Sequence, residues 1–194
     1  MAGTLSAQAR RRLLEIARQS VEAAVRHQRP PALSVADAEL QAHCGAFVTL
    51  TTRGRLRGCL GCFTASEPLW KTIADMARAS ATEDYRFLGQ QLIPQDMPSL
   101  RIEISVLSPM TKIDDPLDIE LGVHGIYLVG KGGRAGTFLP QVATEHHMSK
   151  EEFLSSCCAH KAGLAPDAWR TGEAEVFVYT AEVFGEEEKN PPTD

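Results

Sequence analysis

The order of the predicted helices and strands constrains the fold of this chain most strongly. Apolar residues at every second position predict strands, and apolar residues three or four apart predict a helix that Ser66 can cap. In the first half, the predicted order is strand, strand, helix and strand, over residues 45–52, 56–63, 66–82 and 100–107. Arg53-Gly54 is typical of a turn between the first two strands.

The second half repeats this order without repeating the sequence. Strands are predicted over residues 125–129, 135–139 and 175–184, and a helix begins at the capping box Ser149–Glu152 and ends near Gly163. An amphipathic helix over residues 6–27 precedes both halves. We therefore expect an α+β fold in which two ββαβ halves form a two-lobed single unit with a cleft between them.

The expected boundaries follow from this order. A single domain is predicted over residues 1–190, with lobes at about 10–107 and 108–185. Residues 186–194 are polar and charged, and we expect them to form a disordered tail.

The composition argues against several classes of protein. The chain has 194 residues and a formal net charge of −5, whereas a general nucleic-acid binder carries a basic surface. Residues 1–12 lack the apolar stretch of a signal peptide, and no apolar run reaches the roughly 18 residues of a membrane helix. The five cysteines are an odd number and suit free thiols in a reducing compartment. We therefore expect a cytoplasmic protein with neither membrane nor general nucleic-acid binding.

The stretch RLRGCLGCF, residues 55–63, contains a C-x-x-C pair together with glycines and arginines. In a regular strand, successive side chains point to opposite faces. One face would carry Arg55, Arg57, Cys59, Gly61 and Phe63, and the other would carry Leu56, Gly58, Leu60 and Cys62. Cys59 and Cys62 are therefore not expected to form a disulfide or to bind one metal ion, unless the chain turns sharply at Gly61.

The remaining cysteines and histidines do not form a second pair of metal ligands at a suitable spacing. Cys157 and Cys158 are adjacent on a predicted helix, so their side chains diverge by about 100° and are typical of helix packing. His146, His147 and His160 are typical of loop or helix-surface positions. We therefore expect neither a bound metal nor a cofactor.

Cys59 is the cysteine that we expect to be most reactive as a thiolate. Arg57 is expected to lie on the same face and to favour the thiolate, and Gly58 and Gly61 leave room for a ligand to approach. The alternative is structural: a tight hairpin in which the glycines allow a helix to pack.

Three residues farther along the chain are also candidates. Asp84 and Arg86, between a predicted helix and a predicted strand, either bind a polar ligand or anchor the loop as an ion pair. His124 lies among glycines that leave it accessible, and histidine is the side chain suited to acid or base chemistry near neutral pH. Its alternative is a turn residue that bonds to the backbone.

Seven segments resemble those of one known family, in that family's order. They are residues 47–50, 56–61, 84–87, 105–107, 122–126, 137–142 and 161–164. The most specific is Leu56-Arg57-Gly58-Cys59-Leu60-Gly61. By these segments the chain resembles the AMMECR domain family, whose bacterial members are also called AmmeMemoRadiSam system protein A. The resemblance implies a two-lobed fold with a cleft, and association with a MEMO-type protein and a radical-SAM enzyme. It supplies no reaction.

Two classes of function are then open. In the first, the chain is a ligand-binding or catalytic subunit with a cleft around residues 56–61, where Cys59 is a nucleophile or redox thiol and His124 is the acid or base. A small anionic ligand would be held by Arg57. The candidate ligand-binding residues are Arg57, Gly58, Gly61, Asp84 and Arg86. In the second, the chain is a non-catalytic protein-interaction domain. RNA modification is a weaker third alternative, because the chain is acidic and lacks interleaved aromatic and basic residues.

Overall fold

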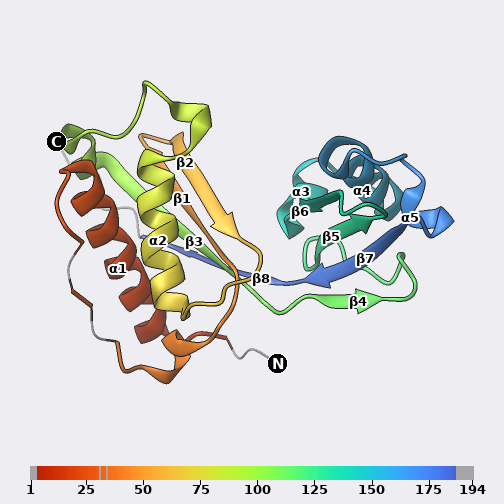
Figure 1. Ribbon diagram of the computed structural model, residues 1–194, viewed down its shortest axis with the longest axis horizontal. Coiled ribbons are helices and arrows are strands. Elements are labelled where there is room, and N and C mark those ends of the chain that lie inside the picture. The colour runs from red at the N-terminus through yellow and green to blue at the C-terminus, as the bar shows by residue number, and fades with distance from the viewer. Residues whose placement is uncertain (1–3, 31, 34, 187–194) are drawn as a thin grey trace. The chain divides into compact units, whose positions relative to one another are not determined.

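The computed structural model describes residues 4–30, 32–33 and 35–186, and the chain divides into two compact units (Figure 1). Unit 1 comprises residues 1–107 and 182–194, and unit 2 comprises residues 108–181. The predicted α+β class and the N-terminal helix are confirmed. The cleft expected between the two halves stays a prediction.

Unit 1 is a four-stranded sheet with two helices packed on one face. The strand order is β2-β1-β3-β8, and β2 and β3 both run antiparallel to β1. Figure 1 shows the two helices side by side across the sheet. The main elements are α1 (Ala7–Val25), β1 (Ala46–Thr52), β2 (Arg55–Cys62), α2 (Leu69–Thr82), β3 (Leu100–Leu107) and β8 (Ala181–Gly185). Three 3-10 turns join them, η1 (Ala38–Gln41), η2 (Tyr85–Phe87) and η3 (Pro94–Ser99).

The alternation along β1 decides which face the helices cover. Ala46, Val48 and Leu50 are fully buried, whereas Phe47 and Thr49 between them are half-buried. Because side chains of a strand alternate between faces, the buried set faces α1 and α2 and the half-buried set faces away from them.

Unit 2 is a second four-stranded sheet, in the order β4-β7-β5-β6. Its core contains apolar side chains from the sheet and from helices that follow β6, including Ile126, Leu128 and Phe153. The strands are β4 (Thr111–Ile113), β5 (Gly125–Gly130), β6 (Ala135–Phe138) and β7 (Ala174–Tyr179). The helices are α3 (Pro140–Glu145), α4 (Lys150–Cys157), the π-helical turn η4 (Cys158–Ala162) and α5 (Ala168–Thr171). The Ser149 capping box is confirmed, and Gly163 ends the helix with a φ of 63°.

Two predicted boundaries are wrong. The strand predicted over residues 175–184 is two strands, because the chain leaves the unit 2 sheet after β7 and enters the unit 1 sheet as β8. At the change, Thr180 and Ser108 exchange hydrogen bonds of 2.9 Å. The helix predicted from Ser66 begins at Leu69, because Pro68 disfavours helical geometry in the residue before it.

The predicted disordered tail, residues 186–194, begins inside the described chain. The Glu186 N–H donates to the carbonyl oxygen of Ile102 at 3.0 Å, next to β3. Residues 187–194 lie outside the described residues. Within the described part of the chain, none of the helices has the length and apolar character to cross a membrane.

The contact between α2 and β2 depends on the absence of a side chain at Gly58. A Cβ atom at this position would lie 1.9 Å from the backbone oxygen of Ser80 and 2.9 Å from its carbonyl carbon. These are backbone atoms of a helix, so they can move only if α2 itself shifts. The structural alternative for Gly58 is therefore realised: the glycine allows the helix to pack.

We expect Gly58→Ala to destabilise the protein by about 2–3 kcal/mol, because the methyl group must displace α2 from the sheet. The control is Gly132→Ala, where φ is 88° and no atom would lie within 4 Å of the new Cβ. That change should cost about 1 kcal/mol, from the left-handed backbone alone. Urea unfolding followed by circular dichroism measures both. Equal losses for the two variants would contradict the packing role of Gly58.

Candidate functional site

A β-bulge at Arg57 changes which side chains share a face with Cys59. The residue pairs on the two sides of the bulge are Leu50 with Gly58 and Thr51 with Leu56, which leaves Arg57 as the extra residue of β2. One extra residue inverts the alternation of all positions before it. Leu56 therefore lies on the Cys59 face, and Arg55, opposite the buried Thr52, lies on the other. The predicted sharing of one face by Arg55 and Cys59 is wrong.

Beyond the bulge the register is regular, and Cys59 and Cys62 lie on opposite faces of β2. Cys59 pairs with the half-buried Thr49, and Cys62 pairs with Ala46 of the core. Both thiols are free. Among the described residues, no group of three or more His, Cys, Asp or Glu side chains is arranged to hold a metal ion.

Two side chains that follow α2 hold the backbone of Cys59. The Cys59 N–H donates to Asp84 Oδ2 at 2.9 Å, and Arg86 Nη2 donates to the Cys59 carbonyl oxygen at 2.9 Å. Because β2 is an edge strand, these groups occupy the position that the backbone of a neighbouring strand would take. The contact therefore closes part of the sheet edge.

Arg86 also compensates the charge of Asp84. Its Nε donates to Oδ1 at 2.9 Å and its Nη2 donates to Oδ2 at 2.6 Å, and its own N–H donates to Oδ1 at 3.2 Å. The Asp84 side chain is only 1% exposed. The bonds from the Arg86 side chain, together with those from the two backbone amides, lower the pKa of Asp84 to about 2 against the opposing effect of burial. So weak a base with both oxygens engaged is suited to anchoring rather than to proton transfer.

Arg57 is directed toward the chain after η2 rather than toward the Cys59 thiol. Its Nη1 donates to Thr52 Oγ1 at 3.0 Å, and its Nη2 contacts the Gln90 oxygen at 3.1 Å, the Gln91 oxygen at 3.4 Å and Asp96 Oδ2 at 3.2 Å. The expected pairing of Arg57 with a Cys59 thiolate is not among its contacts with the described residues. Arg57 and Arg86 instead attach residues 84–96 to β2, and we call these residues the clamped segment.

The room that the two glycines were expected to leave for a ligand is filled by the protein. Ser80 occupies the space beside Gly58, and a Cβ atom at Gly61 would lie 2.4 Å from both the Ala46 oxygen and the Phe47 ring. Both glycines therefore permit close packing inside unit 1.

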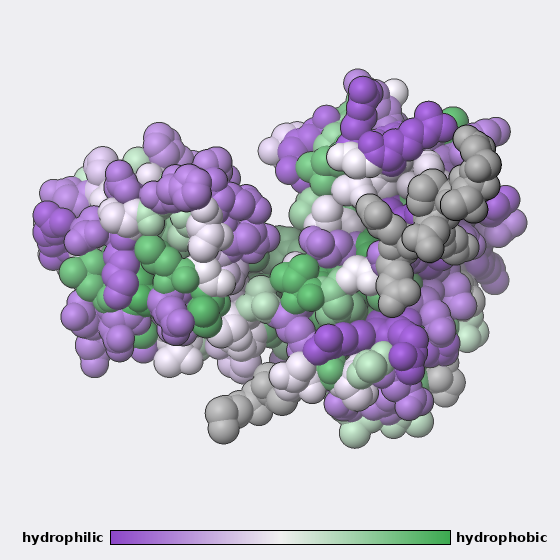
Figure 2. Space-filling view, turned by 180° about the vertical axis from the view of Figure 1, so that it is seen from behind, coloured by the Kyte–Doolittle hydropathy of each residue, from purple (hydrophilic) through white to green (hydrophobic). Residues whose placement is uncertain are grey.

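The Cys59 thiol itself lies on the sheet face away from the helices. Its Sγ accepts a hydrogen bond from Thr49 Oγ1 at 3.2 Å, and the residue is half-buried. Phe47 lies two residues before Thr49 on the same strand face. Its ring meets the ring of Phe63 edge to face, with centroids 5.0 Å apart. Figure 2, seen from the side opposite to α1 and α2, shows apolar surface in green among hydrophilic residues on this side of unit 1.

Three of the other cysteines, Cys44, Cys157 and Cys158, are less suited to reaction as thiolates. Burial raises the pKa of Cys157 to about 12, and it also raises the pKa values of Cys44 and Cys158. A thiol in such surroundings keeps its proton at neutral pH and reacts slowly.

His124 belongs to unit 2, whereas Cys59 belongs to unit 1. Its Nδ1 accepts a hydrogen bond from the backbone N–H of Glu120 at 3.1 Å, and the backbone N–H of His124 donates to the carbonyl oxygen of Glu120 at 2.8 Å. These contacts match the turn-residue alternative. Unit 1 brings together the other candidates, Arg57, Gly58, Cys59, Gly61, Asp84 and Arg86.

Ser80 is a site residue that the sequence analysis missed. The Leu60 N–H donates to Ser80 Oγ at 2.8 Å, and Ser80 Oγ donates to the Val48 carbonyl oxygen at 2.8 Å. The hydroxyl thus joins β1, β2 and α2. The sequence does contain a signal for its burial, because Ser80 continues the helical stripe of Ile73 and Ala77. A buried hydroxyl then needs hydrogen-bond partners.

The contacts of the Asp84 carboxylate with Arg86 and Cys59 predict a pH dependence of stability. A carboxylate whose folded pKa lies below its unfolded value of about 4 stabilises the protein above that value and loses this contribution as pH falls through the folded pKa. We expect Asp84→Asn to lower the free energy of unfolding at pH 7 by about 2 kcal/mol. The difference from the wild type should shrink as the pH falls from about 4 to about 2.

Urea unfolding at several pH values tests this expectation, with Asp75→Asn as the control. Asp75 is an exposed carboxylate on α2 and should contribute little. A loss for Asp84→Asn that is the same at every pH would contradict the ionic basis of the clamp.

Comparisons with known proteins agree with the motif and the fold. The AMMECR1 family pattern matches residues 14–184. Protein MK0488 of Methanopyrus kandleri is 39% identical over 173 residues, which cover 85% of this chain and 80% of that protein. Protein TK0174 of Thermococcus kodakarensis is 37% identical over 193 residues, with coverages of 93% and 91%.

A solved structure has the same fold. It is the crystal structure of the uncharacterized protein PH0010 from Pyrococcus horikoshii, which is 33% identical and gives a TM-score of 0.80. The similarity covers 93% of this chain and 92% of that one. This chain belongs to the AMMECR1 family.

Proposed function

We propose that this AMMECR1-family chain is a protein-binding subunit that docks a partner through the clamped segment. The observation that carries the proposal is a segment attached to the sheet by two arginines that still presents apolar side chains to water. Tyr85, Leu88 and Ile93 are 77%, 66% and 53% exposed. Leu56, next to the bulge in β2, is 41% exposed.

Exposed apolar side chains on a positioned segment are a typical feature of a docking surface. Burying one such side chain contributes roughly 1.5–3 kcal/mol, so a partner that covers several of them gains useful affinity. Arg57 and Arg86 hold the segment in place before binding, which lowers the entropy cost of ordering it in a complex. In this proposal, the motif of residues 56–61 acts by positioning the segment.

The partners that we propose are the MEMO-type protein and the radical-SAM enzyme implied by the family resemblance. The chain would act with them in the cytoplasm, and its five free cysteines support a reducing compartment.

We expect Tyr85→Ser and Leu88→Ser each to weaken binding to such a partner from the same organism by about tenfold or more, because loss of an interface anchor costs about 2 kcal/mol. Isothermal titration calorimetry with the purified proteins measures the affinity. Thermal unfolding of each variant should match the wild type, since both side chains are exposed.

The matched control is Leu117→Ser in unit 2, where the leucine is 36% exposed. This variant should bind like the wild type. Wild-type protein that binds neither partner, or a Leu117→Ser variant that weakens binding as much as Leu88→Ser, would refute the docking role of the clamped segment.

A second candidate is ligand binding or catalysis at Cys59. It is supported by the hydrogen bond from Thr49 to a half-buried thiol that remains partly accessible, while burial disfavours ionisation of Cys44, Cys157 and Cys158. To hold a small anionic ligand, Arg57 would exchange its contact with Asp96 for the ligand. His124 stays the predicted acid or base of this chemistry.

Alkylation by iodoacetamide, followed by mass spectrometry, tests this candidate. We expect Cys59 to be modified in the folded protein, and Cys157 and Cys158 only after unfolding, because both are fully buried. Thr49→Val should change the rate at Cys59 and at no other cysteine. A Cys59 that stays unmodified until the protein unfolds would rule out a thiol function.

A further inference from the structure

An elongated groove runs along α1 on the side of unit 1 that carries β8. Its volume is about 930 Å³, and its walls include Arg11, Leu14, Arg18, Pro98, Arg101 and Phe184. The lining positions on α1 extend from Ala7 to Glu22, which corresponds to about 22 Å of helix. A groove of this length accommodates an extended or helical segment of chain better than a compact small molecule.

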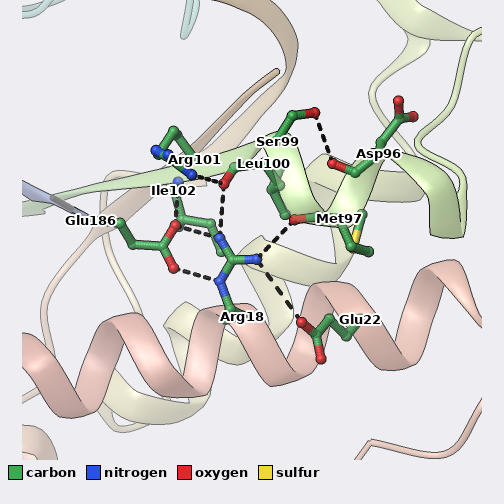
Figure 3. Close-up of polar contacts among 9 residues, drawn as sticks. All are labelled: Arg18, Glu22, Asp96, Met97, Ser99, Leu100, Arg101, Ile102 and Glu186. Carbon is green, nitrogen blue, oxygen red and sulfur yellow. Dashed lines mark hydrogen bonds and ion pairs between the residues drawn. The ribbon is translucent and has the colours of Figure 1, made fainter. Parts of the chain in front are cut away.

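One wall of the groove is fixed by Arg18 (Figure 3). Its Nε and Nη2 donate to the two carboxylate oxygens of Glu186 at 2.5 Å, and Nη2 also donates to the Leu100 oxygen at 2.9 Å. Glu186 Oε2 accepts the Ile102 N–H at 3.1 Å. The charge of Arg18 is thus compensated, and its role is to join α1 to the chain beside β3.

Arg11 and Arg101 are the cations that remain available in the groove. Neither forms an ion pair with a carboxylate of the described residues, and Arg101 Nη1 donates to the Leu100 carbonyl oxygen at 3.0 Å. By contrast, Arg10 is paired with Glu182 at 2.7 Å. The groove lining contains four arginines and two glutamates, Glu22 and Glu186, so it is locally basic in a chain with a net charge of −5.

The groove also has apolar walls. Leu14 and Phe184 are half-buried and pack against the core of unit 1, and Met97 lies at the edge of that core. Cations beside apolar side chains complement a ligand that carries both carboxylates and apolar groups.

We propose that this groove binds an acidic amphipathic peptide segment of a partner protein. Carboxylates of the segment pair with Arg11 and Arg101, and its apolar side chains lie against Leu14 and Phe184. The groove shares no lining residue with the clamped segment, although Met97 of the groove directly follows Asp96, so variants of each surface can be made without altering the other.

The probe is a fluorescein-labelled helical peptide of about 15 residues, which matches the length of the groove, with Leu three or four positions apart and Glu elsewhere. Fluorescence anisotropy with the full chain should give saturable binding. Arg11→Glu and Arg101→Glu should each weaken it about tenfold, because each replaces an attraction by a repulsion. Arg29→Glu makes the same charge change at an exposed position outside the groove and should have less than about a twofold effect.

Further peptides and variants decide the nature of the occupant. A peptide with Lys in place of Glu, and one with Ser in place of Leu, should both fail to bind, whereas Leu88→Ser should bind the acidic peptide like the wild type. The proposal is overturned by absence of saturable binding, by equal binding of the Lys peptide, or by an Arg29→Glu effect equal to that of Arg11→Glu. Displacement of the peptide by millimolar inorganic phosphate would identify a simple anion site and also overturn it. So would tight binding that occurs only when residues 187–194 are deleted, because the chain's own C-terminal segment would then be the occupant.

Discussion

The buried carboxylate of Asp84 is the interaction on which the arrangement around the sequence motif depends. A carboxylate withdrawn from water costs several kcal/mol unless charges and hydrogen bonds compensate it. Arg86 and the backbone of Cys59 supply that compensation, so the chain after α2 is stable only when it lies against the middle of β2. Arg57 then secures the far end of the clamped segment through Asp96. An edge strand that would otherwise offer unpaired backbone groups is closed there by side chains of the same unit.

This arrangement changes the meaning of the chemically suggestive residues in the motif. Gly58 is needed because the Ser80 backbone lies against it. Arg57 binds backbone carbonyl groups and a carboxylate of the clamped segment. Asp84 pairs with Arg86. Cys59 contributes its N–H and its carbonyl oxygen to the clamp, and any residue other than proline has both groups. The backbone contacts therefore account for the position of Cys59 but not for its sulfur. The hydrogen bond from Thr49 to that sulfur keeps thiol chemistry as a separate question from docking.

Short-range patterns predicted the elements of this fold, and longer-range features escaped them. Alternation along residues 46–52 and 100–107 gave the strands directly, because one face of each is buried. The bulge at Arg57 has no local signature, and it inverted the predicted faces of Arg55 and Leu56. The change of sheet at Thr180 was hidden because apolar residues continue on both sides of it. Asp84 and Arg86 were recognised as a possible ion pair, but their contacts with Cys59 join residues 25 and 27 apart and require the fold.

The two docking surfaces proposed for unit 1 adjoin opposite edges of one sheet. The clamped segment lies along β2, and the basic groove is built partly from β8, with β1 and β3 between them in the strand order. Strands in a sheet are spaced about 4.8 Å apart, so the two edges are separated by roughly 14 Å. The clamped segment ends at Asp96 and Met97 lines the groove, so the two surfaces adjoin within η3. Their ligand preferences also differ, since one surface is apolar and the other combines apolar side chains with uncompensated cations. In these two proposals, a single compact unit presents two surfaces with different ligand preferences.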